Sequence, residues 1–122
     1  MGKAYSKTHM FLTNIGTGTT TLGTPTDVSG LSTVGFQIIG LNTGTVQWEA
    51  NITSGDLAGS TTTWIAVRAT NQNSGTAGTT ASGDGIYTMD TRGYVAVQAH
   101  LTTLSIVNNG RLDVYGFIQA EV

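Results

Sequence analysis

The chain has 122 residues and a formal net charge of -2; 10% of its residues are charged, 17 are glycine and none is cysteine. This length suits one domain with a modest core, and the missing cysteines exclude disulfides, thiolate nucleophiles and cysteine metal sites. Five lysines and arginines supply no basic field for a nucleic-acid backbone, so no nucleic-acid partner is expected. No stretch approaches the ~20 apolar residues that span a bilayer, so we expect no membrane partner and a chain made in a cytoplasm.

The low charge needs an explanation, because roughly 25% of the residues of an average soluble domain are charged. Contact with other subunits is one explanation, since lysine and glutamate are depleted at subunit interfaces. Resistance to heat or proteolysis and plain compositional drift are two others.

The first residues differ from the rest of the chain. A basic tip precedes residues 11–15 (FLTNI), which predict one short strand, and a flexible connector rich in threonine and glycine follows. We therefore divide the chain into an N-terminal arm, residues 1–30, and a sandwich domain, residues 31–122. The arm either frays, as the termini of small domains often do, or becomes ordered on a partner.

Residues 34–41 (VGFQIIGL) predict a strand that is apolar on both sides. Because side chains alternate between the two faces of a strand, Phe36 and Ile38 fall on one face, and Ile39 and Leu41 fall on the other beside a glutamine. We expect the second face to be covered by another layer or by a partner.

Residues 45–52 (TVQWEANI) sort more cleanly into one apolar face, which contains Trp48, and one polar face, which contains Glu49. This pattern is typical of a strand with one buried and one solvated side, so we expect the polar face to meet solvent. Residues 42–44 (NTG) predict a tight hairpin before this strand.

Four more strands are predicted, over residues 64–69, 86–90, 94–101 and 112–120. A long polar loop is expected over residues 70–85, and loops of that length tend to bind something or stay mobile. In the last strand Tyr115 and Phe117 share the nominally polar face, which suggests burial by a second sheet, a loop or another subunit. No segment predicts a helix, so the fold class is all-β: an antiparallel β-sandwich with jelly-roll or immunoglobulin-like character.

Residues that perform chemistry are scarce. His9 lies in the arm and His100 on the polar side of a predicted strand, and seven carboxylates are spread without metal-ligand spacing. Asp56 and Asp84 each follow Ser-Gly and are interpreted as turn residues that bond their own backbone, with a calcium site as the alternative. Because no hydrolase, zinc-protease or P-loop motif occurs, we expect no enzymatic activity, no cofactor and no metal.

Trp48 and Trp64 occupy related positions in neighbouring predicted strands. One interpretation is a packed pair at the centre of the sandwich, where two large rings bury much apolar surface. The other is a platform on which a sugar stacks.

Five segments from residue 27 onward stand out together: DVSGLSTVGFQI, GTVQWEANITSGD, TWIAV, GIYTMDTRGYVAVQAHL and RLDVYGFIQAE. They include the aromatic-glutamate pair Trp48-Glu49 and an [IL]-Y-x-x-D-x-x-G-Y segment from Ile86 to Tyr94. With these segments, about three quarters of the chain resembles a family of small tailed-phage virion proteins. The resemblance implies a virion structural protein, either a capsid decoration (cement) protein or a small module of the tail or a fibre.

As a decoration protein, the chain would bind the major capsid protein on the outside of the virion, as a homotrimer, and stabilise the junctions between capsomers. The predicted contact residues lie in the arm and in the mixed strands: Lys3, Tyr5, Lys7, His9, Phe11, Ile39, Leu41, Tyr115 and Phe117. Deleting residues 1–14 is then expected to abolish capsid binding and leave the sandwich folded. The alternative is a carbohydrate- or receptor-binding module with Tyr87 and Tyr94 in its site.

Overall fold

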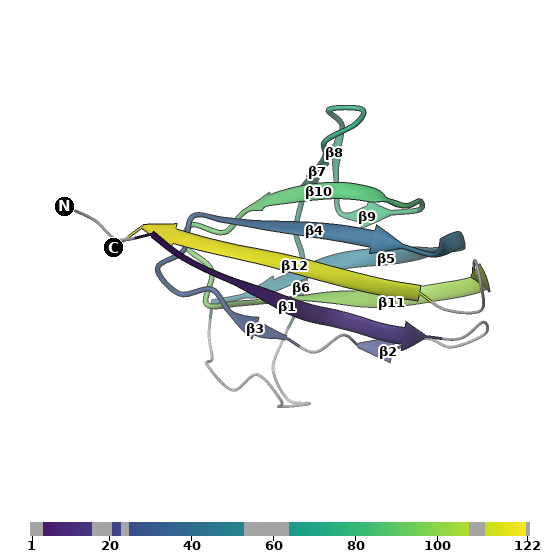
Figure 1. Ribbon diagram of the computed structural model, residues 1–122, viewed down its shortest axis with the longest axis horizontal. Coiled ribbons are helices and arrows are strands. Elements are labelled where there is room, and N and C mark those ends of the chain that lie inside the picture. Colours follow the sequence, from purple (N-terminus) through teal and green to yellow (C-terminus); the bar gives the residue numbers. More distant parts are fainter. Residues whose placement is uncertain (1–3, 16–20, 23–24, 53–63, 108–111, 122) are drawn as a thin grey trace.

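The computed structural model describes the chain except for residues 1–3, 16–20, 23–24, 53–63, 108–111 and 122, and it describes the backbone alone at several strand ends. Two antiparallel sheets face each other as a sandwich (Figure 1), which confirms the predicted all-β fold. The part of the chain that is described contains no helix that is long and apolar enough to cross a membrane.

The first sheet has six strands in the order β1 (Ala4–Ile15), β12 (Leu112–Glu121), β4 (Thr33–Ile39), β10 (Gly85–Asp90), β7 (Ala69–Asn71) and β8 (Ala77–Gly78). The second sheet runs β2 (Thr21–Leu22), β11 (Ala96–Val107), β5 (Leu41–Asn51) and β6 (Ile65–Ala66). Two further short strands belong to the second sheet. The strand β3 (Thr26–Asp27) pairs with β11, and β9 (Thr80–Ala81) pairs with β5.

The core lies between the two sheets and is built around a row of aromatic rings. The ring of Phe36 on β4 lies 4.9 Å from that of Phe11 on β1 and 4.5 Å from that of Trp48 on β5. The Trp48 ring lies 5.4 Å from that of Tyr87 on β10. These contacts join strands of both sheets, so Trp48 is a core residue as predicted. Trp64 is only half-buried and is not part of the core cluster.

The strand β4 alternates as predicted, with Phe36 and Ile38 buried and Ile39 exposed. Leu41 was predicted to share the outward side with Ile39, and this was wrong, because it is buried and only 3% exposed. The reason is Gly40, whose φ of 95° is a conformation that glycine adopts readily. It breaks the alternation between β4 and β5 and turns Leu41 into the core.

The strand β1 is longer than the predicted segment 11–15 and belongs to the first sheet, where it pairs with β12 from Ala4 to Ile15. The pairing shifts between Met10 and Leu12, and both Phe11 and Leu12 are buried. Phe11 is therefore a core residue and is not available to a partner, contrary to prediction. A deletion of residues 1–14 would remove a strand and two core side chains, so we no longer expect it to leave the sandwich intact.

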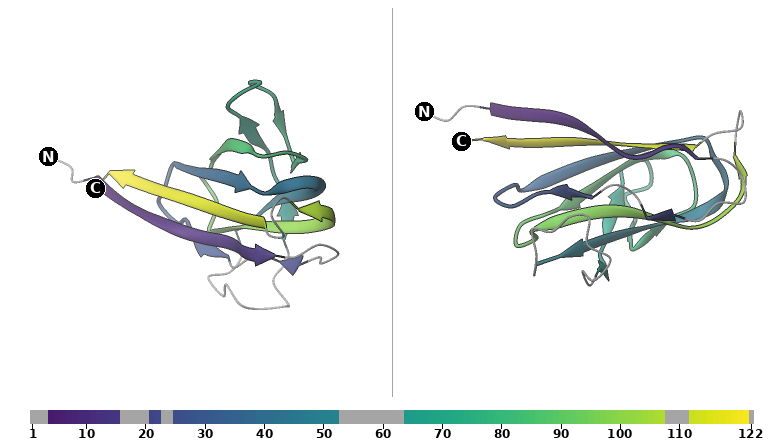
Figure 2. Two further views of the ribbon diagram at one scale, coloured as in Figure 1. Left: turned by 45° about the vertical axis from the view of Figure 1, so that its right-hand side comes forward. Right: turned by 90° about the horizontal axis from the view of Figure 1, so that it is seen from below.

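Gly116 on β12 explains how Phe11 fits. A Cβ at this position would collide with the Phe11 ring, so the ring occupies the space that any other residue would fill. Figure 2 shows the resulting close pairing of β1 and β12 from two directions. The contact between the Phe11 ring and Gly116 fixes the position of β1 on the sheet.

Residues 70–85 do not form the structureless loop that was predicted. They contain the end of β7, the two-residue strands β8 and β9, and a tight turn in which Gly75 has a φ of 75°. Asn71 stabilises this turn, because its side-chain oxygen accepts a hydrogen bond from the backbone N–H of Asn73 at 2.8 Å.

Candidate interaction surface

The outer face of the first sheet carries large apolar side chains that the core does not use. Ile39 is 45% exposed, Ile86 is 51% exposed and Phe117 is 50% exposed. The register places them close together, because Tyr115 and Ile86 both pair with Gln37 on β4. We call Ile39, Ile86, Tyr115 and Phe117 the outer apolar patch.

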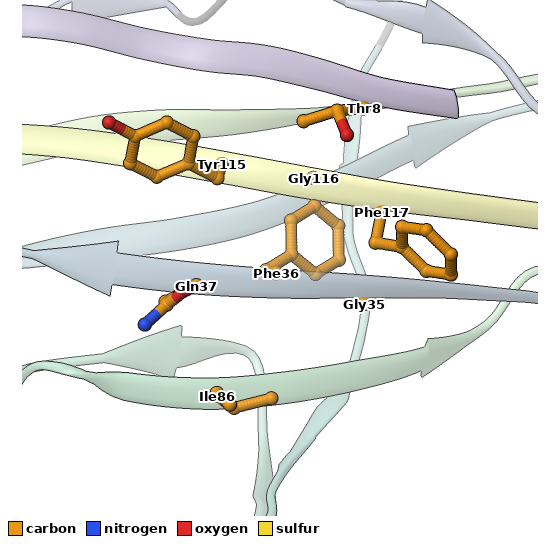
Figure 3. A pocket seen from close by; sticks show the side chains of 8 residues that line it. All are labelled: Thr8, Gly35, Phe36, Gln37, Ile86, Tyr115, Gly116 and Phe117. Atoms are coloured by element: carbon orange, nitrogen blue, oxygen red, sulfur yellow. The ribbon is translucent and has the colours of Figure 1, made fainter. Parts of the chain in front are cut away.

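A hollow of about 390 Å³ opens within this patch (Figure 3). It exists because Gly35 has no side chain at a position where its strand neighbours are Phe117 and Thr88. A Cβ at Gly35 would meet the backbone oxygen of Phe117, at 3.9 Å, so the described part of the chain leaves this space open. Tyr115 and Ile86 contribute to its lining. Its size and apolar lining suit one or two large side chains of another molecule.

A second, polar hollow of about 440 Å³ lies near one end of the same face. Asp90 and Arg92 help to line it and form an exposed ion pair, with Arg92 Nη2 2.7 Å from Asp90 Oδ2. The side-chain hydrogen bonds from Arg92 lower the pKa of the Asp90 carboxyl to about 2. The face therefore combines an apolar centre with a charged end, as protein interfaces often do.

Three of the predicted contact residues meet on this face. Ile39 and Phe117 are exposed in the outer apolar patch, and Tyr115 beside them is half-buried. Sequence reasoning missed Ile86, although the alternation in IYTMD should have revealed it: Tyr87 points into the core, so its neighbour must point outward.

The remaining predicted contact residues do not join the patch. Besides the buried Phe11 and Leu41, His9 is half-buried, with its ring edge-on to that of Phe11 at 4.6 Å. Lys3 and the side chains of Tyr5 and Lys7 lie outside the described residues.

The outer face of the second sheet contradicts the prediction that the polar side of β5 meets solvent. Glu49 and Asn51 are each 5% exposed and Gln98 on β11 is 1% exposed. The Glu49 carboxylate accepts hydrogen bonds of 2.7 Å from the side-chain amides of both Gln47 and Gln98, and Nδ1 of His100 lies 3.1 Å from Glu49 Oε2. We call Gln47, Glu49, Gln98 and His100 the Glu49 network.

Asn51 lies on the same strand as Glu49, but its side chain is not part of the Glu49 network. Both polar atoms of its side chain are buried, and neither has a hydrogen-bond partner among the described residues. Its backbone is paired, since Asn51 lies opposite Ala96 on β11 and its carbonyl oxygen accepts from the N–H of Val95 at 2.8 Å. Burial of an unpaired amide is unfavourable, so this position lowers the stability of the fold.

Asp84 was predicted to bond the backbone of its own turn. Its side chain instead reaches across to the β4–β5 junction. Its two carboxylate oxygens accept hydrogen bonds from the backbone N–H groups of Gly40 at 2.9 Å and Leu41 at 2.7 Å. Asp84 therefore holds the glycine bend that sends Leu41 inward. Asp56 lies outside the described residues. Among the described residues, no group of three or more potential metal ligands occurs.

The two tyrosines proposed for a sugar site are engaged elsewhere. Tyr87 is buried, and its hydroxyl donates to the carbonyl oxygen of Gly83 at 2.9 Å. Burial raises the pKa of the Tyr87 hydroxyl, and the negative charge of Asp84 adds to the effect. Tyr94 is half-buried and packs against the core. A stacking platform built from these two rings is therefore not present.

No protein-family model matches the chain, and no curated protein sequence matches it. Two solved structures do. The SPBc2 prophage-derived protein YomS matches with a TM-score of 0.76 and 12% identity, over 97% of this chain and 96% of that one. The PBSX exported protein XepA matches with a TM-score of 0.77 and 14% identity, over 96% of this chain but only 38% of XepA. At these identities the comparison establishes a shared fold: the chain is a β-sandwich similar to YomS and to one part of XepA.

Proposed function

We propose that the chain is a phage structural protein, and more specifically a capsid decoration protein that binds the shell through the outer apolar patch. The observation that carries the proposal is this patch, in which two half-exposed apolar side chains, Ile86 and Phe117, line an open hollow together with Tyr115. Its place of action would be the capsid surface of a virion, after production in the host cytoplasm. The partner would be the major capsid protein.

Two further observations support the phage setting. The sequence segments around Trp48-Glu49 and from Ile86 to Tyr94 resemble those of small tailed-phage virion proteins. YomS, one of the solved structures to which the chain is similar, is described as prophage-derived.

The physical role would be to add buried contact area at the junctions between capsomers. An apolar side chain that enters the hollow over Gly35 would lose its contact with water, and such burial yields roughly 25 cal/mol per Å² of apolar surface. Each copy adds a modest free energy, and the shell gains stability because many copies bind.

The test is co-sedimentation of the purified chain with expanded capsids that lack it, from the phage that encodes it. We expect saturable binding at hundreds of copies per capsid. Ile86→Ser should weaken this binding strongly, because it removes an apolar side chain at the hollow. The matched control is Ile65→Ser, the same change at a residue that is 59% exposed on the other sheet, and it should bind as the wild type does.

Equal loss of binding in both variants would contradict the assignment of the surface. Binding to purified tails instead of capsids would support the tail or fibre module, which is the alternative that the sequence left open. Absence of binding to any part of the virion would overturn the structural role altogether.

A further inference from the structure

The strand β1 forms a long edge of the first sheet. It stands first in the strand order, and among the strands that the structure describes only β12 pairs with it. The opposite edge of that sheet is β8, which has two residues, and the strands on the sides of the second sheet, β2, β3, β6 and β9, also have two each. Figure 1 shows β1 next to β12 at the edge of the first sheet, with β2 and β3 of the other sheet below it in the view. The edge formed by β1 is therefore one long strand, whereas each side of the second sheet is covered in part by short strands.

The backbone of a long edge strand is a ready template for another strand, because it presents N–H and C=O groups on its free side. Natural proteins protect such edges with charge, proline or bulges. Here the pairing with β12 is regular from Ala4 to Met10 and becomes irregular only after Met10. The regular part reads AYSKTHM, with one lysine and no proline. Its protection is slight.

We propose that this edge pairs with the β1 edge of a second copy of the chain, in antiparallel fashion about a two-fold axis. A second copy fits better than a foreign strand, because one contact then covers the long free edge of both molecules. The two β1 edges are equal in length and match each other along their regular part. The proposal does not rest on capsid binding.

The neighbourhood of the edge is compatible with a copy of itself. Thr8 and Met10 pair with Phe117 and Tyr115 on β12, so a second β1 would extend the sheet and bring the outer apolar patches of both copies onto one continuous surface. The formal net charge of -2 opposes this approach only weakly.

The charge of Lys7 selects the register. Full overlap of the segment from Ala4 to Met10 would set Lys7 directly opposite its counterpart, and like charges opposite each other are destabilising. A two-fold axis at Thr8 avoids this, because Lys7 then faces His9 of the partner subunit and Thr8 faces its own copy. This arrangement predicts a dimer and not the homotrimer expected from the sequence.

The first experiment measures molar mass by light scattering over a range of concentrations. The wild type should reach twice the 12.7 kDa of one chain. Thr8→Lys should raise the dissociation constant of the dimer about fivefold, since it sets two positive charges opposite each other. The matched control is Gln37→Lys, which adds the same charge at an exposed position of β4 and should leave the dimer unchanged. Circular dichroism confirms that each variant is folded.

The second experiment uses the absence of cysteine in the chain. Thr8→Cys places two thiols at the proposed axis, where facing Cβ atoms are about 5 Å apart, and should form a disulfide-linked dimer on mild oxidation. Gln37→Cys should not. A monomeric or trimeric wild type, or a dimer that tolerates Thr8→Lys while Thr8→Cys does not cross-link, would overturn the proposal.

Discussion

The outer faces of the two sheets have opposite character. On the first sheet Ile86 and Phe117 stand about half exposed. On the second, Glu49 and Gln98 are buried and bonded to each other at 2.7 Å. A polar residue pattern along a strand therefore does not identify the side that meets water. Polar side chains can be buried when they satisfy one another, and apolar ones remain outside where no further layer of the chain covers them.

The difference suggests two uses for the two faces. The Glu49 network links β5 to β11 through side chains as well as backbone, so the second sheet's face is internal structure. The outer apolar patch contains side chains that are about half exposed, and it is the face that the proposed capsid binding would use. Substitutions on the two faces should separate these roles.

The largest effect is expected from Glu49→Ala. The change leaves the amides of Gln47 and Gln98 and the ring of His100 without their shared acceptor, and loss of one partner in a buried charged network costs about 3 kcal/mol in the free energy of unfolding. Urea denaturation measures the loss. Glu49→Gln, which keeps one acceptor oxygen, should lose about half as much; a loss below about 1 kcal/mol for Glu49→Ala would show that the network is not structural.

Asn51→Leu should act in the opposite direction. It replaces a buried amide that has no partner among the described residues by an apolar side chain of similar size, and removing such an unpaired group should raise the free energy of unfolding by about 1 kcal/mol. The same urea experiment measures the gain. Asn51→Asp, which buries a charge, is the control and should destabilise the fold. A loss of stability with leucine would mean that the Asn51 side chain has a partner.

Phe117→Ser should have little effect on stability. The ring is half exposed on the outer apolar patch, so we expect a change of about 0.5 kcal/mol, as for most surface substitutions. Thermal unfolding provides the measurement. A loss as large as that of Glu49→Ala would place Phe117 among the structural residues and end the contrast between the two faces.

The smallest effect concerns the exposed pair of Asp90 and Arg92. The folded-state pKa of the Asp90 carboxyl is lowered from 3.8 to about 2, so any stabilisation is present above pH 4 and disappears as the pH falls through 2. NMR titration of the Asp90 carboxyl should follow this pKa. In Arg92→Gln it should return toward 3.8, and a pKa that stayed near 2 would contradict the role of Arg92.

Much of the fold could be predicted from period-two patterns. They placed Phe36, Ile38 and Trp48 in the core and Ile39 and Phe117 on the opposite side, because strand geometry alone decides such alternation. The same patterns predicted three members of the outer surface. These patterns could not predict which face is exposed to solvent, because exposure depends on what covers a face and not on the strand itself.

The rest depends on contacts between residues far apart in the chain. Leu41 turns inward because Asp84 holds the bend at Gly40. Glu49 is satisfied by Gln98 and His100, about fifty residues later. Phe11 belongs to the core because Gly116 leaves room for its ring. None of these pairs has a local signature, so a single sequence could not reveal them.

The pairing of β1 with β12 also has a consequence for how the chain folds. It joins Ala4 to Glu121, nearly the whole length of the chain, and contacts of such high sequence separation form slowly. During synthesis β1 has to wait for its partner, with Phe11 and Leu12 exposed to the solvent meanwhile. A circular permutant that links the two ends would turn this most distant pairing into a hairpin, and we expect it to fold faster than the natural order of strands.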